Sequence, residues 1–345
     1  MQQKWEVVRP ERYVEGKYFG SLKAKVIDPG ICSHCGTCSV CPVKGIRVED
    51  KPIYFPNWEE DCIDCAACVR VCPRYNYVPL NGMGDYIEIL AAKSKRFKGQ
   101  DGAMATEYLI SAIEKGLIDE AIFVGRDEEW RTTVHRVRDA EQVNTLLTGT
   151  KYSFAAVLPE MIQSVRERNN VGVVGTPCMV SGIRQLQREI RLFAKRVKLV
   201  VGLFCTENFY WHQLSAFLAE RGIDLSRGIK TDIKKGKFIV EYADGEKAEI
   251  PVKEFDPIIP SGCKVCQDFA AVESDVSIGS VGSKAGFSTL IIREEVAKDL
   301  LEFMKEQGTV EILEEVKMKI VEKLIHHKIE IHPYPPKKQA EKAEE

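Results

Sequence analysis

The chain has 345 residues, of which 44% are apolar and 29% charged, a composition typical of soluble globular proteins. A formal net charge of −2 and a pI of about 6.4 argue against binding to nucleic acid or to an anionic membrane surface. No apolar run reaches transmembrane length and the N-terminus lacks a signal-peptide core, so we expect a cytoplasmic protein.

Eight of the twelve cysteines form two runs near the N-terminus. The runs are Cys32-x2-Cys35-x2-Cys38-x2-Cys41-Pro42 and Cys62-x2-Cys65-x2-Cys68-x3-Cys72-Pro73. The second run has the ligand spacing of a bacterial [4Fe–4S] ferredoxin, in which the cysteine before proline ligates the other cluster. The expected ligand sets are therefore Cys32, Cys35 and Cys38 with Cys72, and Cys62, Cys65 and Cys68 with Cys41. The first run is one residue shorter before its last cysteine, which leaves the direction of Cys41 open.

The length favours two domains. We divide the chain into an N-terminal segment, a dicluster ferredoxin domain, a large domain and a flexible tail, at residues 1–22, 23–80, 81–330 and 331–345. The predicted fold class is α/β for the large domain, a mixed sheet with flanking helices, plus a small α+β two-[4Fe–4S] ferredoxin-like domain.

The large domain alternates predicted strands and helices. Asp101 is expected to cap a helix that ends near Gly116. Buried strands are predicted at 121–125, 171–175 and 197–204, with helices from 178 to 187 and from 211 to 221. Antiparallel strands are predicted over 229–251, further strands at 275–278 and 288–293, and two helices at 294–307 and 314–327.

Four cysteines lie outside the two runs, at Cys178, Cys205, Cys263 and Cys266. Cys178 and Cys205 each follow a predicted strand, and parallel strands bring their carboxyl ends to one edge of a sheet. The Cys263-x2-Cys266 pair is able to complete a four-thiolate shell there. From spacing alone, a [4Fe–4S] cluster, a structural zinc ion and unconnected buried cysteines all remain open.

Three loops are candidates for binding an anionic cofactor. They are 99–102, 149–152 and 279–283, which are rich in glycine and small polar residues. Each also has a plain structural interpretation, as a helix cap, a surface turn and a simple turn. A G-x-G-x-x-G fingerprint is absent from the sequence, so a standard NAD site is not expected.

Together these motifs resemble the family of coenzyme F420 hydrogenase/dehydrogenase beta subunits. The resemblance runs from about residue 90 to 330 and rests on the segments 99–102, 149–154, 176–178, 182–184, 202–209, 235–238, 262–266 and 271–289. Members with an N-terminal two-cluster ferredoxin segment, such as the electron-input subunit of archaeal F420H2 dehydrogenases, are the most similar. One departure is Ala103, which stands where the family usually has a second glycine.

The resemblance implies FAD in the large domain and a third [4Fe–4S] cluster on Cys178, Cys205, Cys263 and Cys266. It makes the three loops candidate flavin contacts: Gln100, Asp101, Gly102, Gly149, Thr150, Lys151, Tyr152, Gly279, Ser280, Gly282 and Ser283. No side chain is nominated as a catalytic acid or base, because hydride transfer belongs to FAD.

The implied function is hydride exchange between coenzyme F420 and FAD, with single electrons passing through three [4Fe–4S] clusters to a partner. The expected partner is a membrane F420H2 dehydrogenase, a hydrogenase, a formate dehydrogenase or a heterodisulfide reductase, and the chain is placed in the cytoplasm or on the cytoplasmic face of such a complex. Two alternatives stay open: a ferredoxin-dependent reductase of another substrate, similar to the chlorophyll-derivative reductases, and a flavin-free electron-transfer subunit.

Overall fold

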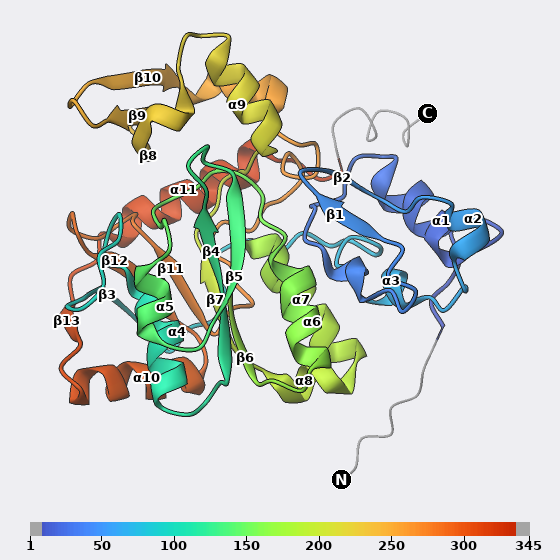
Figure 1. Cartoon of the computed structure of the whole chain (residues 1–345), viewed down its shortest axis with the longest axis horizontal. Coiled ribbons are helices and arrows are strands. Elements are labelled where there is room, and N and C mark those ends of the chain that lie inside the picture. Colours follow the sequence, from blue (N-terminus) through green and yellow to red (C-terminus); the bar gives the residue numbers. More distant parts are fainter. Residues whose placement is uncertain (1–8, 336–345) are drawn as a thin grey trace.

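The structure is a computed structural model that describes residues 9–335. Figure 1 shows a small cysteine-rich part on one side and a larger α/β part on the other. The first eight residues of the predicted N-terminal segment, and residues 336–345 of the predicted tail, lie outside the described residues.

The small part is built from short elements between cysteine loops. They are α1 (Tyr18–Leu22), the π-helical turn η1 (Lys23–Ile27), the 3₁₀ helix η2 (Thr37–Val40), β1 (Arg47–Glu49), β2 (Lys51–Tyr54), α2 (Trp58–Asp61) and α3 (Ala67–Arg70). β1 and β2 form an antiparallel hairpin. The buried ring of Phe19 packs edge-on against Phe55, with 5.2 Å between ring centroids, and cysteines form part of the same apolar core.

The large part is organised around one eight-stranded sheet in the order β13-β3-β12-β11-β7-β6-β4-β5. Its strands are β3 (Glu88–Ser94), β4 (Glu120–Arg126), β5 (Thr132–Val137), β6 (Val171–Gly175), β7 (Val197–Leu203), β11 (Val276–Gly279), β12 (Ser288–Ile292) and β13 (Val310–Leu313). β4, β6, β7 and β11 run parallel, whereas β5, β12 and β13 are antiparallel to their neighbours. The predicted mixed sheet is therefore confirmed.

Helices cover both faces of this sheet (Figure 1). The helices of the large part are α4 (Met104–Glu114), α5 (Ala140–Asn144), α6 (Val157–Arg166), α7 (Pro177–Glu189), α8 (Arg191–Arg196), α10 (Glu295–Glu306) and α11 (Met318–Ile331). Alternate strand residues serve opposite faces, because side chains alternate along a strand. Val174 and Val201 join the core under α4 and α10, while Val173 and Val200 join the core under α6 and α7.

A second, three-stranded antiparallel sheet stands beyond one end of the large sheet (Figure 1). It consists of β8 (Gly228–Lys234), β9 (Lys237–Tyr242) and β10 (Lys247–Pro251), accompanied by α9 (Trp211–Ala219) and the 3₁₀ turns η3 (Leu225–Arg227) and η4 (Val252–Ile258). Its core is aromatic: Phe255 contacts Phe209, Phe217 and Phe238, with ring centroids 4.7 to 5.4 Å apart.

Most predicted strands and helices are present, but several further elements were not predicted. Asp101 does not cap α4, because Ala103 occupies the cap position with φ 54° and no side chain caps the helix there. The strands β3, β5 and β13 and the helices α5, α6 and α8 were not predicted. Of these, β13 lies between α10 and α11 and pairs with β3. The last helix was predicted too early at both ends: α11 begins at Met318 rather than 314 and continues to Ile331, and the next residue, His332, is only 3% exposed.

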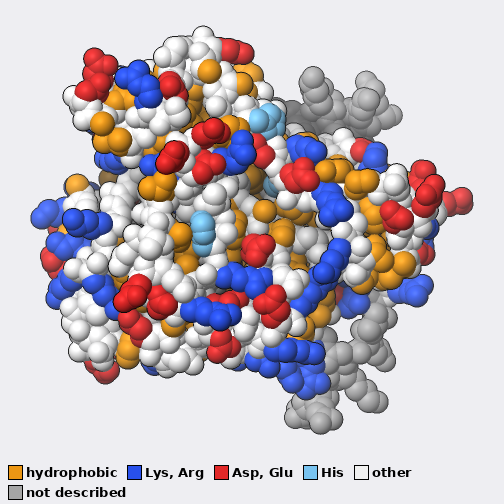
Figure 2. Space-filling model, in the orientation of Figure 1, with side chains coloured by type: hydrophobic (Ala, Val, Ile, Leu, Met, Phe, Trp, Pro, Cys, Tyr) orange, Lys and Arg blue, Asp and Glu red, His pale blue; other side chains and the backbone are white. Residues whose placement is uncertain are grey.

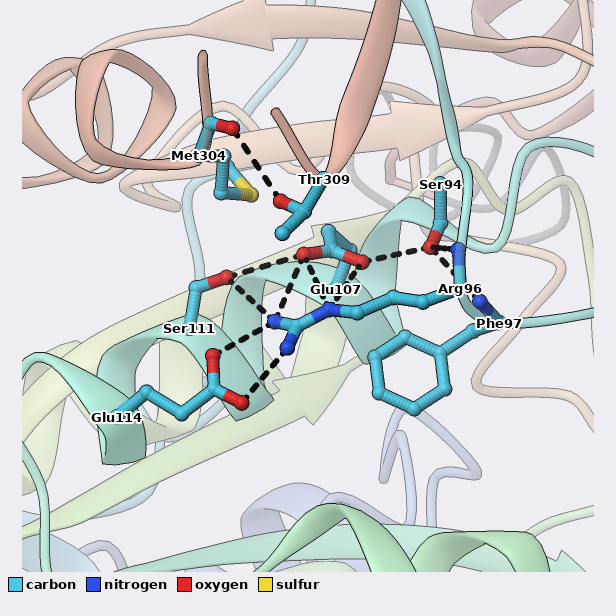
Figure 3. A network of polar contacts seen from close by, with 8 residues as sticks. All are labelled: Ser94, Arg96, Phe97, Glu107, Ser111, Glu114, Met304 and Thr309. Atoms are coloured by element: carbon cyan, nitrogen blue, oxygen red, sulfur yellow. Dashed lines mark hydrogen bonds and ion pairs between the residues drawn. The ribbon is translucent and has the colours of Figure 1, made fainter. Parts of the chain in front are cut away.

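One buried carboxylate stabilises the start of the large domain (Figure 3). Glu107 on α4 is fully buried and accepts hydrogen bonds from Ser94, at 2.6 Å, and Ser111, at 3.1 Å. Arg96 forms an ion pair with it at 2.9 Å and also reaches the partly exposed Glu114 at 2.6 Å. A buried charge of this kind is tolerated because each of its oxygens has a partner.

Replacement of this carboxylate tests how much the network contributes. We expect Glu107→Gln to destabilise the holoprotein by about 2 kcal/mol, since buried donors lose their acceptor. Glu114→Gln, on the exposed side of the same arginine, should cost less than about 1 kcal/mol. The measurement is anaerobic chemical unfolding of both variants, and equal losses would show that burial of Glu107 is unimportant.

Candidate functional site

The carboxyl ends of the parallel strands gather the chemically interesting residues of the large domain. Cys178 lies in the first turn of α7, directly after β6, and Cys205 follows β7 by two residues. The loop after η4 brings Cys263 and Cys266 to the same place. All four cysteines line one cavity, as the strand-edge argument predicted, together with Thr176, Asn208, Gly262 and Lys328.

The four thiols of this inner cavity face one another without a disulfide. Burial raises the pKa of Cys205 to about 12 and that of Cys263 to about 11. Thiolates are therefore strongly disfavoured unless a cationic group binds them. Within residues 9–335 no three cysteine, histidine or carboxylate side chains converge closely enough to hold a single metal ion. The four thiols instead line one cavity, which fits a cluster that binds several donors at once.

The wall of the inner cavity contains a buried lysine that the sequence analysis missed. The Lys328 ammonium donates hydrogen bonds to the carbonyl oxygens of Cys205, at 2.6 Å, and Asp268, at 2.7 Å. Burial lowers its pKa, but the nearby thiols and the Asp268 carboxyl outweigh that effect and the net pKa is raised. Val321, Ile325 and Lys328 follow helical spacing along the buried face of α11, which is the signal that was available.

A second cavity lies in the ferredoxin-like part and is lined by Cys32, Cys35, Cys38 and Cys72. This grouping is the one predicted from spacing. The two cavities adjoin. Ser33 and Arg74 line both, and the Cys178 thiol points to the Ser33 carbonyl oxygen at 3.8 Å. A side chain on Gly262 would collide with the Cys32 carbonyl, at 1.9 Å, so only glycine permits this close approach.

The remaining ferredoxin cysteines form a third group. Burial raises the pKa of the Cys68 thiol, and Cys62, Cys41 and Cys65 are the neighbours that raise it further. Cys41 therefore lies with the second run. This third group lies next to the group of the first run. The pKa of Cys38 is raised mainly by burial, then by the cysteines of its own group, and also by Cys68. Cys65 is exposed, so this third group is the one nearest the surface.

The shortened first run has a helical explanation. Cys38 lies in the 3₁₀ helix η2, and Cys41 is three residues later. Cys68 lies in the α-helix α3, and Cys72 is four residues later. A 3₁₀ helix rises about 2.0 Å per residue and an α-helix about 1.5 Å, so both steps advance about 6 Å. The tighter helix compensates for the missing residue.

The loops before these helices also share a backbone conformation. His34 and Asp64 occupy equivalent places in the two runs and have φ values of 57° and 56°. The next equivalent pair, Gly36 and Ala66, has φ values of 89° and 64°. Positive φ is uncommon for residues other than glycine. The same left-handed turns in both runs show that the two loops present their cysteines in the same way.

The candidate flavin contacts also lie along the carboxyl edge of the sheet. The Thr150 amide donates to the Gln100 side chain at 3.3 Å, which joins the first two loops. Gly102 is wedged between β3 and β12, since an added side chain would lie 2.3 Å from the Ala92 carbonyl. Its amide donates to Ser288 at 3.1 Å. For Gly102, close packing of the backbone is itself a sufficient reason for glycine.

The other loop residues are divided between the two sheets. Tyr152 packs against Phe238 of β9, and Gly149 has φ 104°. Burial raises the pKa of Asp101, with Asp232 of β8 as a further cause, so Asp101 faces the small sheet rather than α4. In the third loop, Ser283 donates to the carbonyls of Ser280 and Phe287, and Gly279 packs against the Phe204 ring. Gly282 has φ 93° and its carbonyl accepts from Lys317.

Two cations meet at the end of β4. The Lys151 ammonium donates to the Val124 carbonyl at 2.7 Å, and burial lowers its pKa to about 8, helped by Arg126. The buried Nε atom of Arg126 has no partner within the described residues. Neighbouring cations with lowered pKa values and an unused donor are typical of a site for an anionic group. Lys151 was predicted from the sequence as a candidate contact, whereas Arg126 was not.

Three stretches of the chain match known protein families. Residues 24–82 match the 4Fe-4S dicluster domain. Residues 89–163 and 168–317 match, respectively, the N-terminal and C-terminal families of the coenzyme F420 hydrogenase/dehydrogenase beta subunit. The small part is therefore a [4Fe–4S] ferredoxin domain, as predicted. No helix within residues 9–335 has both the length and the apolar character needed to cross a bilayer.

Several relatives are named for chemistry with coenzyme F420. The chain is 37% identical over 321 residues to the coenzyme F420-dependent sulfite reductase of Methanocaldococcus jannaschii, covering 87% of the chain but 49%, about half, of that protein. It is 30% identical over 321 residues to one of the subunits of the F(420)H(2) dehydrogenase of Methanosarcina mazei, covering 88% of the chain and 91% of that relative. Identity to the coenzyme F420 hydrogenase beta subunit of Methanothermobacter thermautotrophicus is 35% over 263 residues, covering 72% of the chain and 93% of that relative.

A solved structure agrees with these matches. A chain of the F420-reducing [NiFe] hydrogenase complex from Methanosarcina barkeri superposes with a TM-score of 0.69 at 30% sequence identity, covering 74% of this chain and 93% of that one. The homologues are subunits of multi-subunit F420-linked oxidoreductases. The chain belongs to the family of coenzyme F420 hydrogenase/dehydrogenase beta subunits.

Proposed function

We propose that the chain is an iron–sulfur flavoprotein that exchanges a hydride between coenzyme F420 and FAD and passes single electrons to a partner oxidoreductase. The observation that carries this proposal is the juxtaposition of two thiol-lined cavities, one in each domain, which share Ser33 and Arg74. Such an arrangement serves electron transfer between domains, whereas a structural zinc site in the large domain alone has no need of it.

Three [4Fe–4S] clusters are proposed on the three groups of cysteines. The inner group is Cys178, Cys205, Cys263 and Cys266, the middle group is Cys32, Cys35, Cys38 and Cys72, and the outer group is Cys41, Cys62, Cys65 and Cys68. Contacts between successive groups support this order: Cys178 approaches Ser33, and Cys68 lies near Cys38. The outer group contains the exposed Cys65, beside the exposed Ile63, where a partner is able to dock.

FAD is proposed along the carboxyl edge of the sheet, next to the inner group. When bound, it supplies the chemistry that joins two-electron hydride exchange to one-electron transfer. In this proposal Lys151 and Arg126 hold an anionic group of the cofactor, and the hydrogen-bonded loops of Gln100 and Thr150 border it. The names of the relatives support F420 as the substrate.

The partner is proposed to be another subunit of a redox complex. Asp and Glu side chains gather at the end of the ferredoxin domain that carries α2 (Figure 2). The first turn of α2 holds three exposed carboxylates, Glu59, Glu60 and Asp61. These charges lie on the chain next to the outer cysteines, and charges around a docking surface favour orientation and rapid association.

An anaerobic cofactor inventory with an F420 assay tests the proposed function. We expect about twelve irons and one FAD per chain, and bleaching of F420 absorbance when an artificial donor supplies electrons. A preparation with full iron but no flavin would favour a pure electron-transfer subunit. A flavin-containing preparation that leaves F420 unbleached would favour another substrate.

The inner cysteines are tested one at a time. Cys263→Ser should lose about four irons and F420-linked reduction of a viologen dye, while keeping its flavin. Lys264→Gln is the matched control, because this half-buried residue lies in the same loop and its ammonium bonds to Asp256 rather than to a cysteine. Loss of zinc instead of iron from the cysteine variant would establish a structural metal site.

The charge on Lys151 predicts a pH dependence of flavin binding. With its pKa lowered to about 8, the amine is protonated below pH 8 and loses its charge as the pH rises further. FAD affinity of the flavin-depleted protein should therefore fall between about pH 7 and pH 9, and Lys151→Gln should bind about tenfold more weakly at pH 7 and show less dependence. Lys198→Gln, at the opposite edge of the sheet, is the control. Unchanged titrations would remove Lys151 from the flavin site.

A further inference from the structure

Arg74 is a buried cation that lies between the inner and middle cysteine groups. It follows Cys72 and Pro73, at the point where the chain leaves the second cysteine run. Only 3% of the residue is exposed, and it lines both thiol cavities. Because an arginine side chain remains protonated under all ordinary conditions, a full positive charge is fixed in this position.

The surroundings of Arg74 contain thiols rather than carboxylates. Its guanidinium stacks on the Tyr77 ring, 3.8 Å from the centroid, and Tyr77 is itself held by a hydrogen bond to the Val265 carbonyl at 3.0 Å. Within the described chain, burial lowers the pKa of Arg74, and the groups that oppose this are Cys266, Tyr77, Cys178 and Cys263. The guanidinium thus faces the inner thiols.

One donor of Arg74 is unused. The buried Nη1 atom has no hydrogen-bond partner among residues 9–335. Burying a cationic donor without a partner in an apolar interior is strongly destabilising, so its retention requires a compensating negative group. Lys328, the other buried cation at the inner cavity, differs because two backbone carbonyls already satisfy it.

We propose that Arg74 donates to the inner cluster and raises the reduction potentials of the inner and middle clusters together. This inference rests on the proposed function, since it requires clusters on both cysteine groups. A [4Fe–4S] cluster with four thiolates carries net negative charge and gains one more electron on reduction, so a nearby fixed cation stabilises the reduced form. The ferredoxin domain thereby supplies a charge to a cofactor held by the other domain.

The test is redox potentiometry of the full holoprotein, followed by EPR, with iron analysis of every variant. Arg74→Gln should keep its iron. The reduction potentials of its inner and middle clusters should become more negative by about 59 mV, which is a tenfold change in a one-electron reduction equilibrium. Arg74→Lys keeps the positive charge, so its cluster potentials should lie close to those of the unsubstituted protein. The outer cluster should move least, because Arg74 lines the cavities of the inner and middle groups.

Arg70→Gln is the matched control. Arg70 lies in the same segment and contacts the large domain, but Glu189 neutralises it at 2.8 Å. Because both side chains of this pair reach solvent, which screens the charge left on Glu189, the control should shift the inner and middle potentials much less than Arg74→Gln. If Arg74→Gln loses iron while Arg74→Lys retains it, the requirement for charge stands. If both variants lose iron, or if Arg74→Gln keeps iron and its potentials do not move, the inference is overturned. Absence of clusters from the unsubstituted protein would instead refute the proposed function.

Discussion

The close approach of Gly262 to the carbonyl of Cys32 sets the relation between the two domains. A β-carbon at this position would overlap the carbonyl oxygen, so the loop carrying Cys263 is able to lie against the first cysteine run only without a side chain there. Ser33 and Arg74 consequently line both cavities. The proposed relay depends on this contact, because electron transfer between cofactors requires that they be near one another.

The same contact buries the thiols, which changes their pKa values. Sulfur atoms gathered in a low-dielectric interior disfavour the thiolate form, as the raised pKa values of Cys32, Cys205 and Cys263 illustrate. Binding of the proposed clusters would reverse this preference, so the domain interface and the clusters would stabilise each other. Arg74 and Lys328 add positive charge where negative charge gathers, and they do so from opposite ends of the chain.

The large sheet provides a second organising constraint. Parallel strands β4, β6, β7 and β11 deliver their carboxyl ends to one edge, where loops, rather than regular elements, supply the functional groups. The inner cysteines and the Arg126–Lys151 pair both lie at this edge. The small antiparallel sheet adds a further wall, since Thr231 of β8 donates to the Thr150 carbonyl at 2.8 Å.

Much of this organisation was readable from local pattern. Cysteine spacing predicted the two ferredoxin runs and their exchanged last members, and short apolar runs predicted the central strands, because ligand spacing and side-chain alternation are local properties. The cap at Asp101 was wrong, since Gly102 is packed between β3 and β12 and α4 begins only at Met104, with Ala103 at the cap position. The strand β13 was missed because its pairing with β3 joins segments more than two hundred residues apart.

The sequence by itself identified the cysteines that are proposed to carry the redox chemistry, because thiols at fixed spacing have few other uses in such a chain. Only the tertiary structure decided how they are grouped and ordered. Arg74, Lys328 and Arg126 look like ordinary surface cations in the sequence. Their burial beside thiols and a neighbouring ammonium arises from contacts between distant segments, and no local pattern encodes the low dielectric that makes those charges matter.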